Sequence, residues 1–170
     1  DECMGSNEVN LFEGENLLIE AEQYSFCEFG KEGIDSIWEI ESSFTNYSGD
    51  GYVAALPDDG NNAFDTTNGP IVGYNITLQT NGTYYLWVRF AASNGGGDSI
   101  HIGVNGNALT YGGVGFGAPD NNAWNWKKIE VSIASTGNNS IEVWMREDGV
   151  MIDSILITTN PSYDPREVSN

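Results

Sequence analysis

Residues 83–92, with the sequence Thr-Tyr-Tyr-Leu-Trp-Val-Arg-Phe-Ala-Ala, decide the fold class of this chain. Hydrophobic side chains occupy alternate positions in this stretch, and a period of two is typical of a β-strand that buries one face. The face expected to point into the core carries Tyr84, Leu86, Val88 and Phe90, and the opposite face carries Tyr85, Trp87 and Arg89. The stretch therefore predicts a long, half-buried strand.

The same short period recurs along most of the chain. Further strands are expected around Val53 and Ala55 and at residues 71–78, 99–104, 126–133, 141–145 and 152–158. Tight turns are expected at Asn105-Gly106 and at residues 136–139. About eight or nine strands at hairpin spacing, with no convincing amphipathic helix, predict an all-β fold that is an antiparallel β-sandwich.

Length and composition indicate one domain. A chain of 170 residues with 21 Gly and 12% aromatic residues fits a single β-rich unit with many turns. We expect this unit to span residues 16–160, between a tail or linker at residues 1–15 and another at residues 161–170. Cys3 and Cys27 either form one disulfide bond or remain free thiols, and the extracellular character of the other features favours the bond.

The net charge restricts the partners. Six Lys and Arg against 25 Asp and Glu give a formal charge of −19 at pH 7. Nucleic acids and anionic membrane surfaces attract basic patches, so neither is an expected partner. The acidity fits a secreted protein that holds divalent cations. It also makes a densely sulfated or uronic polysaccharide a less natural partner, unless calcium or Arg146 mediates the contact.

Three carboxylates interrupt hydrophobic runs near the two ends of the domain. Glu20 and Glu22 are two residues apart, so they share one face if the segment is a strand, and Asp153 lies within the last expected strand. If the first and last strands are neighbours, the three carboxylates meet and repel one another unless a cation lies between them. Clustered hard oxygen atoms suit calcium, so the sequence predicts a structural calcium ion. The simpler alternative is solvated carboxylates at a sheet edge.

Aromatic residues near two long loops are candidates for sugar binding. Residues 57–70 and 106–125 are irregular, and loops of that length in a compact domain are usually functional or mobile. Trp124 ends the second loop, where an exposed indole can stack on a pyranose ring; the alternative is a loop anchor packed under its own turn. Tyr47 is the best second aromatic residue, with Trp38 behind it.

Polar residues beside the same loops could select the hydroxyl pattern of a sugar. Arg146, Glu147 and Asp148 follow a strand, and Asn122 belongs to the loop before Trp124. Such groups hydrogen-bond vicinal hydroxyls, although pairing among the three charged residues is an equal alternative.

Three further tryptophans are interpreted from their positions in the expected strands. Trp126 is expected in the core. Trp87 and Trp144 both oppose an inward-facing stripe, so they could share a second binding surface, although simple covering of the sheet is the safer interpretation.

Evidence for catalysis is thin. His101 is the only histidine and is expected on the outward face of a strand, so a Ser-His-Asp triad is not expected. Carboxylates are abundant, but none has the context of a glycosidase acid and nucleophile. We therefore expect no catalytic residue.

Four motifs in this order resemble carbohydrate-binding modules of the families 6 and 35 type. They are Ile-Glu-Ala-Glu at 19–22, Gly-Thr-Tyr-Tyr-Leu-Trp-Val-Arg at 82–89, Trp-Asn-Trp at 124–126 and Ile-Asp-Ser-Ile at 152–155. The resemblance covers roughly residues 16–158. It implies a two-sheet jelly roll, a structural calcium ion on the residues matching Glu20, Glu22 and Asp153, and a sugar clamped between Trp124 and Tyr47.

The expected function is therefore that of a secreted, monomeric, non-catalytic module. It would bind a polysaccharide, with a marine galactan such as agarose as the first guess, and hold a catalytic domain of the same polypeptide near its substrate. One alternative is a calcium-stabilised adhesive or structural domain of a surface protein. The other is a small polysaccharide-degrading enzyme on the same fold.

Overall fold

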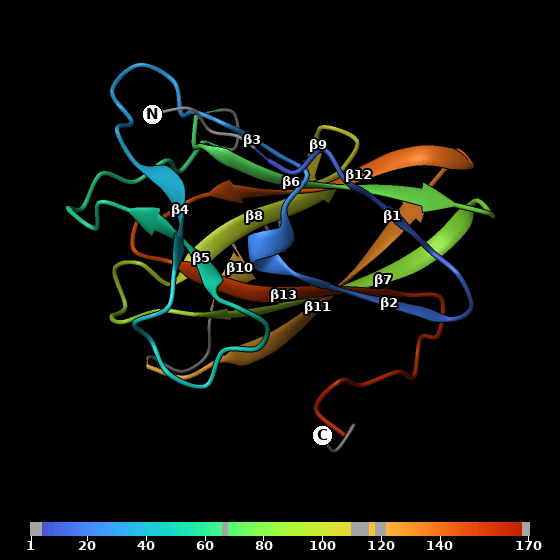
Figure 1. Cartoon of the computed structure of the whole chain (residues 1–170). Helices are drawn as coiled ribbons and strands as arrows, with labels where there is room; N and C mark the ends of the chain where they lie inside the picture. The colour runs from blue at the N-terminus through green and yellow to red at the C-terminus, as the bar shows by residue number, and fades with distance from the viewer. Residues whose placement is uncertain (1–4, 66–67, 110–115, 118–121, 168–170) are drawn as a thin grey trace.

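The computed structural model describes residues 5–65, 68–109, 116–117 and 122–167, and these residues form a sandwich of two β-sheets (Figure 1). The first sheet has the order β1 (Val9–Leu11), β6 (Ile71–Leu78), β12 (Gly137–Met145), β8 (Ser99–Val104) and β10 (Phe116–Gly117), with β3 (Phe26–Glu28) on β6 and β9 (Asn107–Leu109) on β8. The second has the order β11 (Asn125–Ile133), β7 (Gly82–Ala91), β13 (Met151–Thr158), β5 (Tyr52–Leu56) and β4 (Ile37–Glu41), with β2 (Asn16–Glu20) on β13. One short 3₁₀ helix, η1 (Ala21–Gln23), follows β2.

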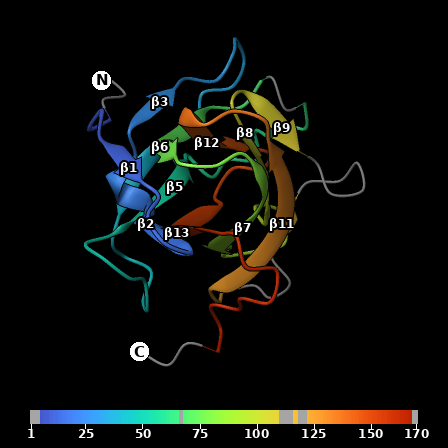
Figure 2. The same cartoon turned by 90° about the vertical axis from the view of Figure 1, so that its right-hand side faces the viewer.

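Antiparallel pairing dominates both sheets, so the predicted antiparallel sandwich is confirmed. The exception among the described strands is β1, which runs parallel to β6. Viewed from the end, the two sheets face each other across the core, and β11 curves along one side (Figure 2). Among the described residues, no helix is long and hydrophobic enough to cross a membrane.

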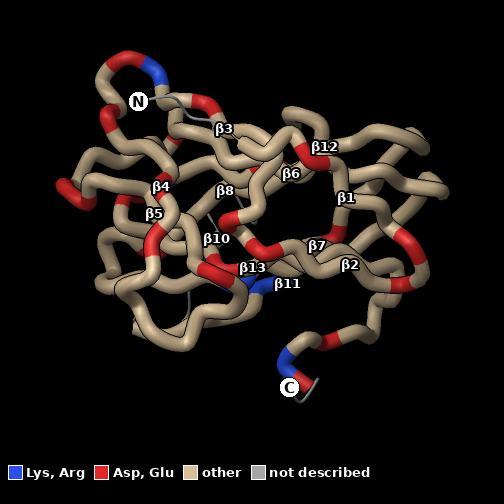
Figure 3. The backbone as a smooth tube through the Cα atoms, in the orientation of Figure 1, with Lys and Arg blue, Asp and Glu red and all other residues tan. Residues whose placement is uncertain are grey.

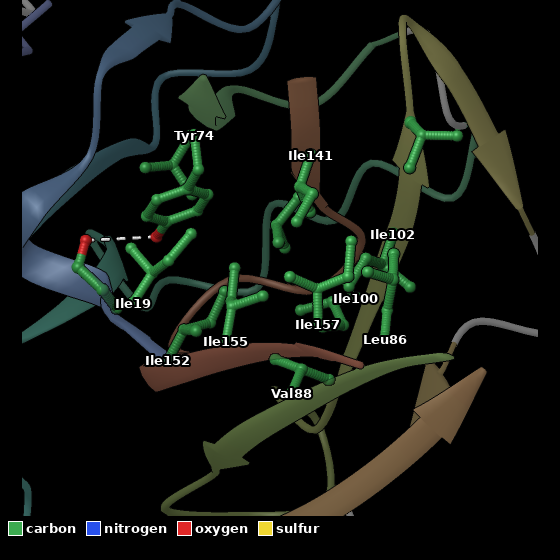
Figure 4. Close-up of a cluster of buried hydrophobic side chains, with 14 of the residues drawn as sticks. Ile19, Tyr74, Leu86, Val88, Ile100, Ile102, Ile141, Ile152, Ile155 and Ile157 are labelled. Carbon is green, nitrogen blue, oxygen red and sulfur yellow. Dashed lines mark hydrogen bonds between the residues drawn. The ribbon is translucent and has the colours of Figure 1, made fainter. Parts of the chain in front are cut away.

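The core between the sheets follows the alternation predicted for β7. Tyr84, Leu86, Val88 and Phe90 are all at most 1% exposed. The second sheet sends Ile152, Ile155 and Ile157 of β13 into the same space, and the first sheet sends Ile100, Ile102 and Ile141 (Figure 4). Tyr74 is buried with them and donates its hydroxyl to the Ala21 carbonyl oxygen at 3.1 Å, and burial raises the pKa of this phenol.

The first long strand and the last strand are neighbours, as the metal hypothesis required. Glu20 of β2 lies opposite Ser154 of β13, and Asn16 lies opposite Thr158. The register of β13 against β7 shifts between Ile152 and Ser154, which leaves Asp153 as the extra residue of a β-bulge. The side chain of Asp153 is fully buried, although it belongs to neither face of a regular strand.

Most of the strands that the sequence did not predict are short. β1, β3, β9 and β10 have three residues or fewer, too few to display a period. β1 lies within the expected N-terminal tail, and Phe12 beyond it is only 5% exposed, so this part of the tail belongs to the sandwich. Cys27 is disulfide-bonded; the other cysteine of the sequence, Cys3, lies outside the described residues.

We expect Phe90→Ala to lower the free energy of unfolding by about 3–5 kcal/mol, because it leaves a cavity in the fully packed core. Urea denaturation followed by tryptophan fluorescence measures the change. Ile40→Ala is the control, since Ile40 is 55% exposed and should change stability by about 0.5 kcal/mol or less. Equal losses for the two variants would contradict this account of the core.

Candidate functional site

The loop between β4 and β5, residues 42–51, is held by the carboxylates of the predicted metal site. The Ser48 amide donates to Asp153 Oδ1 at 2.7 Å, and the Ser48 hydroxyl lies 2.6 Å from Glu20 Oε2. The Asp50 amide donates to Glu22 Oε1 at 2.9 Å. The structure therefore brings Glu20, Glu22 and Asp153 to one short segment of chain.

Arg89 completes this arrangement from β7. Its guanidinium forms an ion pair with Asp153 Oδ2 and donates to the Asn46 carbonyl oxygen at 3.0 Å. A carboxylate without exposed surface is stable only with such partners, because an unpaired buried charge is costly. Arg89 and Ser48 together satisfy the Asp153 carboxylate.

The same carboxylates have several features of a calcium site. They offer the hard oxygen atoms that calcium prefers, and Glu22 Oε2 is buried without a hydrogen-bond partner among the described residues. Burial raises the pKa of Glu20, and the nearby charges of Asp153 and Glu22 raise it further. However, no group of three or more His, Cys, Asp and Glu side chains in the described ranges is arranged to hold a metal ion.

The backbone at Gly49 packs closely against these carboxylates. A Cβ atom on Gly49 would clash with Glu22 Oε1 and would lie 3.2 Å from Glu20 Cγ, so the loop backbone is directly beside these side chains. The donor chemistry fits calcium, with Glu20, Glu22 and Asp153 as the side chains that would hold it. The calcium ion therefore stays a prediction.

Four aromatic rings form a cluster beside this loop. Trp124 lies edge-on to Phe44 and Tyr52, with ring centroids 5.3 Å and 5.5 Å away, and Tyr47 lies 5.8 Å from Tyr52. The Trp124 indole donates to the Thr45 carbonyl oxygen at 2.9 Å. Trp124 and Tyr47 thus both pack against Tyr52, but Trp124 is a half-buried anchor of the loop rather than a free indole.

A groove of about 340 Å³ lies on the outer face of the second sheet, against this aromatic cluster. Its hydrophobic lining is Phe44, Tyr52, Ala54, Leu56 and Met151, and its polar lining is Glu41, Ser43, Asp58, Ser93 and Gly149. Flat hydrophobic surfaces beside hydroxyl and carboxylate groups suit a sugar ring, which presents C–H bonds on one side and hydroxyl groups at its edge. We call this hollow the aromatic groove.

Most residues of the aromatic groove were not predicted as site residues. Tyr52 is on the outer face with Ala54 and Leu56, whereas Val53 and Ala55 point into the core. The alternation along β5 could have shown this. The contribution of Ser93 and Met151 could not be seen, because it depends on which strands are neighbours.

Trp38 does not belong to the site, which corrects the prediction. Its side chain is 4% exposed, lies in the main core and donates through the indole to the Pro70 carbonyl oxygen at 3.0 Å. It therefore has no free face for a sugar. Trp126 is also placed differently from the prediction: it is half-buried on the outer face of β11, opposite Arg89, rather than in the core.

Asp148 is likewise corrected, because it has no exposed surface. Its Oδ2 atom accepts hydrogen bonds from the amides of Asp59, Gly60 and Asn61 at 2.7, 2.7 and 3.0 Å. Asp148 thus holds the loop after β5 through the backbone amides of residues 59–61. Its neighbour Gly149 is the residue that lines the aromatic groove.

Arg146 and Glu147 are not among the residues that line the aromatic groove. Arg146 donates to Ser99 Oγ at 2.7 Å and lies over the Phe64 ring at 4.8 Å. Glu147 accepts hydrogen bonds from the Asp98 amide at 3.2 Å and from the Ser99 hydroxyl. These two residues also pair with each other, with Arg146 Nη1 3.4 Å from Glu147 Oε1, so the alternative of pairing among the charged residues holds for them.

Asn122 remains near the groove. It is exposed, and its amide donates to the Ala92 carbonyl oxygen at 2.7 Å, beside the groove residue Ser93. Trp87 and Trp144 cannot share a surface, since they belong to different sheets, in β7 and β12.

Comparison with known proteins identifies the class of this fold. A family 35 carbohydrate-binding module from Clostridium thermocellum superposes with a TM-score of 0.61 at 19% identity, over 85% of this chain and 98% of that one. The C-terminal family 6 module of a marine laminarinase from Zobellia galactanivorans superposes with a TM-score of 0.54 at 21% identity, over 85% and 99%. The chain has the fold of carbohydrate-binding modules of families 35 and 6.

The sequence places the chain in a particular family. Residues 17–164 match the glycosyl hydrolase family 115 C-terminal domain, and the chain belongs to that family. It is also 26% identical over 152 residues to the uncharacterized protein P23 of Formosa agariphila. The match covers 75% of this chain and 37% of that relative's length.

We expect Asp148→Ala to destabilise the domain by about 2–3 kcal/mol, because three backbone amides lose a charged acceptor. Urea unfolding measures the loss. Asp59→Ala is the control, since the exposed Asp59 side chain accepts one bond, from the Asn61 amide at 3.2 Å. If Asp148→Ala were as stable as the unmodified domain but bound sugar more weakly, Asp148 would be a ligand-binding residue.

Proposed function

We propose that this domain is a non-catalytic carbohydrate-binding module whose ligand lies in the aromatic groove. The observation that carries the proposal is the groove itself, a hollow lined by aromatic rings, hydroxyl groups and carboxylates on a fold that carbohydrate-binding modules share. A sugar ring would pack against the half-buried Phe44, which Trp124 contacts edge-on, while Tyr52, only 2% exposed, supports the Trp124 ring.

The polar lining favours a neutral sugar. Glu41 and Asp58 accept hydrogen bonds from hydroxyl groups, while Ser43 and Ser93 can donate or accept, and no Lys or Arg lines the aromatic groove. Two carboxylates would repel a sulfate or carboxylate placed between them. A neutral galactan such as agarose is the polysaccharide that we propose.

The domain would act as a secreted monomer that keeps an attached enzyme at its polysaccharide. Membership of a family described as the C-terminal domain of a glycosyl hydrolase supports this role. Tethering raises the effective concentration of substrate without any new contact in the catalytic site.

Calcium binding by Glu20, Glu22 and Asp153 is a second part of the proposal. The ion would supply positive charge between the carboxylates and hold residues 48–50, and with them the loop that carries Phe44 and Tyr47. The unpartnered Glu22 Oε2 atom supports it. Backbone oxygen atoms and water can complete such a site, since calcium accepts about 6–8 oxygen ligands.

We expect Phe44→Ala to weaken polysaccharide binding about tenfold or more, because it removes one aromatic wall of the aromatic groove. Trp124→Ala should also weaken polysaccharide binding, because it removes the edge-on contact that positions the Phe44 ring. Affinity electrophoresis in gels containing agarose-type galactan, xylan, β-glucan or alginate measures retardation. Phe29→Ala is the matched control, since Phe29 is 55% exposed in another loop.

No retardation in any neutral gel, with calcium present and the protein folded, would favour the adhesive or structural alternative. Release of sugar fragments from any of the polymers would instead favour the enzyme alternative.

We expect saturating calcium to raise the melting temperature of chelator-treated protein by roughly 5–10 °C, since a ligand at about 100 times its Kd adds about 2.7 kcal/mol. Differential scanning calorimetry measures the shift. Glu22→Gln should reduce it, whereas Glu13→Gln, an exposed change of the same kind, should not. A melting temperature that changes with neither calcium nor chelator would contradict the proposed calcium site.

A further inference from the structure

The only histidine of the chain is buried on the outer face of the first sheet. Its neighbours Ile100 and Ile102 in β8 point into the core, so His101 points the other way. The His101 side chain is 3% exposed, and the residue lies opposite Trp144 of β12. Neither ring nitrogen atom has a hydrogen-bond partner among the described residues. Buried polar groups are normally hydrogen-bonded, and the proposed sugar site does not use this side chain, so its burial needs another explanation.

Part of the loop after β5 surrounds this imidazole. The backbone of residues 63–64 and the Asp65 carboxylate are close enough to act on the charge of the ring. The same segment is held to the end of β12, because the Ala63 amide donates to the Arg146 carbonyl oxygen at 2.8 Å. The Arg146 guanidinium also lies 4.8 Å from the Phe64 ring centroid. Residues 63–65 and Arg146 therefore enclose the ring together.

This environment opposes a positive charge on the imidazole. Burial lowers the pKa of His101 below its ordinary value, and the nearby Arg146 guanidinium lowers it further. Asp65 and the backbone of residues 63–64 act in the opposite direction without compensating. The ion-pair partner of Arg146 is Glu147, at 3.4 Å. The ring is therefore neutral at neutral pH, and a proton gained in acid would place a second cation beside Arg146.

The same loop begins at the aromatic groove. Asp58 lines the groove, and the amides of residues 59–61 donate to Asp148 Oδ2. Asn62 follows them and accepts a hydrogen bond from the Asp148 amide at 3.2 Å. Residues 58–65, which we call the covering loop, thus contact the groove at one end and His101 at the other. A change beside His101 can reach the groove through eight residues of continuous backbone.

We propose that His101 is a pH switch that holds the covering loop closed at neutral pH and releases it in acid. Protonation of the buried ring beside Arg146 is unfavourable, so residues 63–65 lift away and water reaches the imidazole. Asp58 then leaves its place in the aromatic groove, and affinity for the polysaccharide falls. This regulation rests on the proposed function, because it acts on the same ligand site.

Proton uptake sets the direction and the steepness of the effect. With the loop open, the ring has the ordinary pKa of a histidine, about 6.5, and with the loop closed its pKa is lower. Closure is therefore fully stable above about pH 6.5 and loses stability as the pH falls through the closed-state pKa. Opening takes up one proton in this window, so the ratio of open to closed loop rises by up to about tenfold per pH unit.

The other acid-sensitive groups favour the opposite trend. Red acidic positions are spread over much of the backbone in Figure 3, blue basic positions are few, and the formal charge is −19. Mild acid reduces the repulsion among these carboxylates. Burial also raises the pKa of Glu20 and of Glu142, so their protonation favours the folded domain. Loop opening on acidification therefore points to His101 rather than to general charge.

Nuclear magnetic resonance tests the switch without mutation, because no other histidine contributes imidazole signals. A titration from about pH 8 to about pH 5 measures the pKa of His101, which should lie below the ordinary value. Hydrogen exchange of the amides of residues 59–61 and 63 measures loop opening in the same samples. Their protection should fall by up to about tenfold per pH unit in acid, while that of β7 amides stays constant.

His101→Leu removes the titrating group, so the protection of the covering loop should no longer fall in acid. His101→Gln, a neutral polar replacement, serves the same purpose if His101→Leu does not fold. Glu147→Gln is the matched control, since it removes the carboxylate partner of Arg146 and should leave the pH dependence in place. Loss of the pH dependence in Glu147→Gln but not in the His101 variants would assign it to the carboxylate and overturn the proposal.

Affinity electrophoresis at about pH 7.5 and about pH 5 then tests the link to the groove, with the neutral polymer that retards the domain. Retardation of the unmodified domain should fall in proportion to the closed fraction of the loop, and His101→Leu should keep its retardation in acid. An ordinary pKa for His101, or loop opening that leaves affinity unchanged, would overturn the proposal.

The two proposals fail in different ways. Retardation by a polymer together with loop protection that does not change with pH would retain the proposed function and remove the switch. Loop protection that falls in acid, with no retardation by any polymer at any pH, would instead contradict the proposed function and still support release of the covering loop by His101.

Discussion

The buried carboxylate of Asp153 is the constraint on which the rest of the site depends. It sits at a bulge in β13, the strand that contacts β2, β5 and β7, and it has no exposed surface. Burial of that charge requires partners, and the structure supplies Arg89 from β7 and Ser48 from the loop between β4 and β5. The Asp153 carboxylate thus fixes β13, the neighbouring strand β7 and the loop between β4 and β5 relative to one another.

The aromatic cluster follows from that fixation. Arg89 also lies 5.5 Å from the Trp124 ring centroid, and the loop tied to Asp153 carries Phe44 and Tyr47. The rings pack against a hydrophobic cluster of Tyr52, Ala54, Ala91 and Met151 that is separate from the main core, and they contact the polar residues at Arg89. On the outer face of the same sheet, carboxylates flank the aromatic groove, whereas Lys128 lies over the Tyr85 and Trp87 rings.

Local pattern predicted the fold well where strands were long. The alternation of residues 83–92 identified the buried face of β7, and residues 71–78 and 99–104 were predicted with the bounds that β6 and β8 have. The site was predicted less well. Trp38 and Asp148 were predicted as site residues, but packing buries both. Whether a polar turn faces solvent or supports another loop depends on segments that are distant in the sequence.

The sequence by itself determined the strand period and the acidity, because these follow from residue type. Only the tertiary structure decided that β2 pairs with β13, which brings Glu20, Glu22 and Asp153 together, and which aromatic rings share a surface. Lys128 and Trp87 are 41 positions apart in sequence yet directly opposite in the sheet. Composition contains no distances, so the charge of −19 does not show that Lys128 lies over the Trp87 ring; strand register decides that contact.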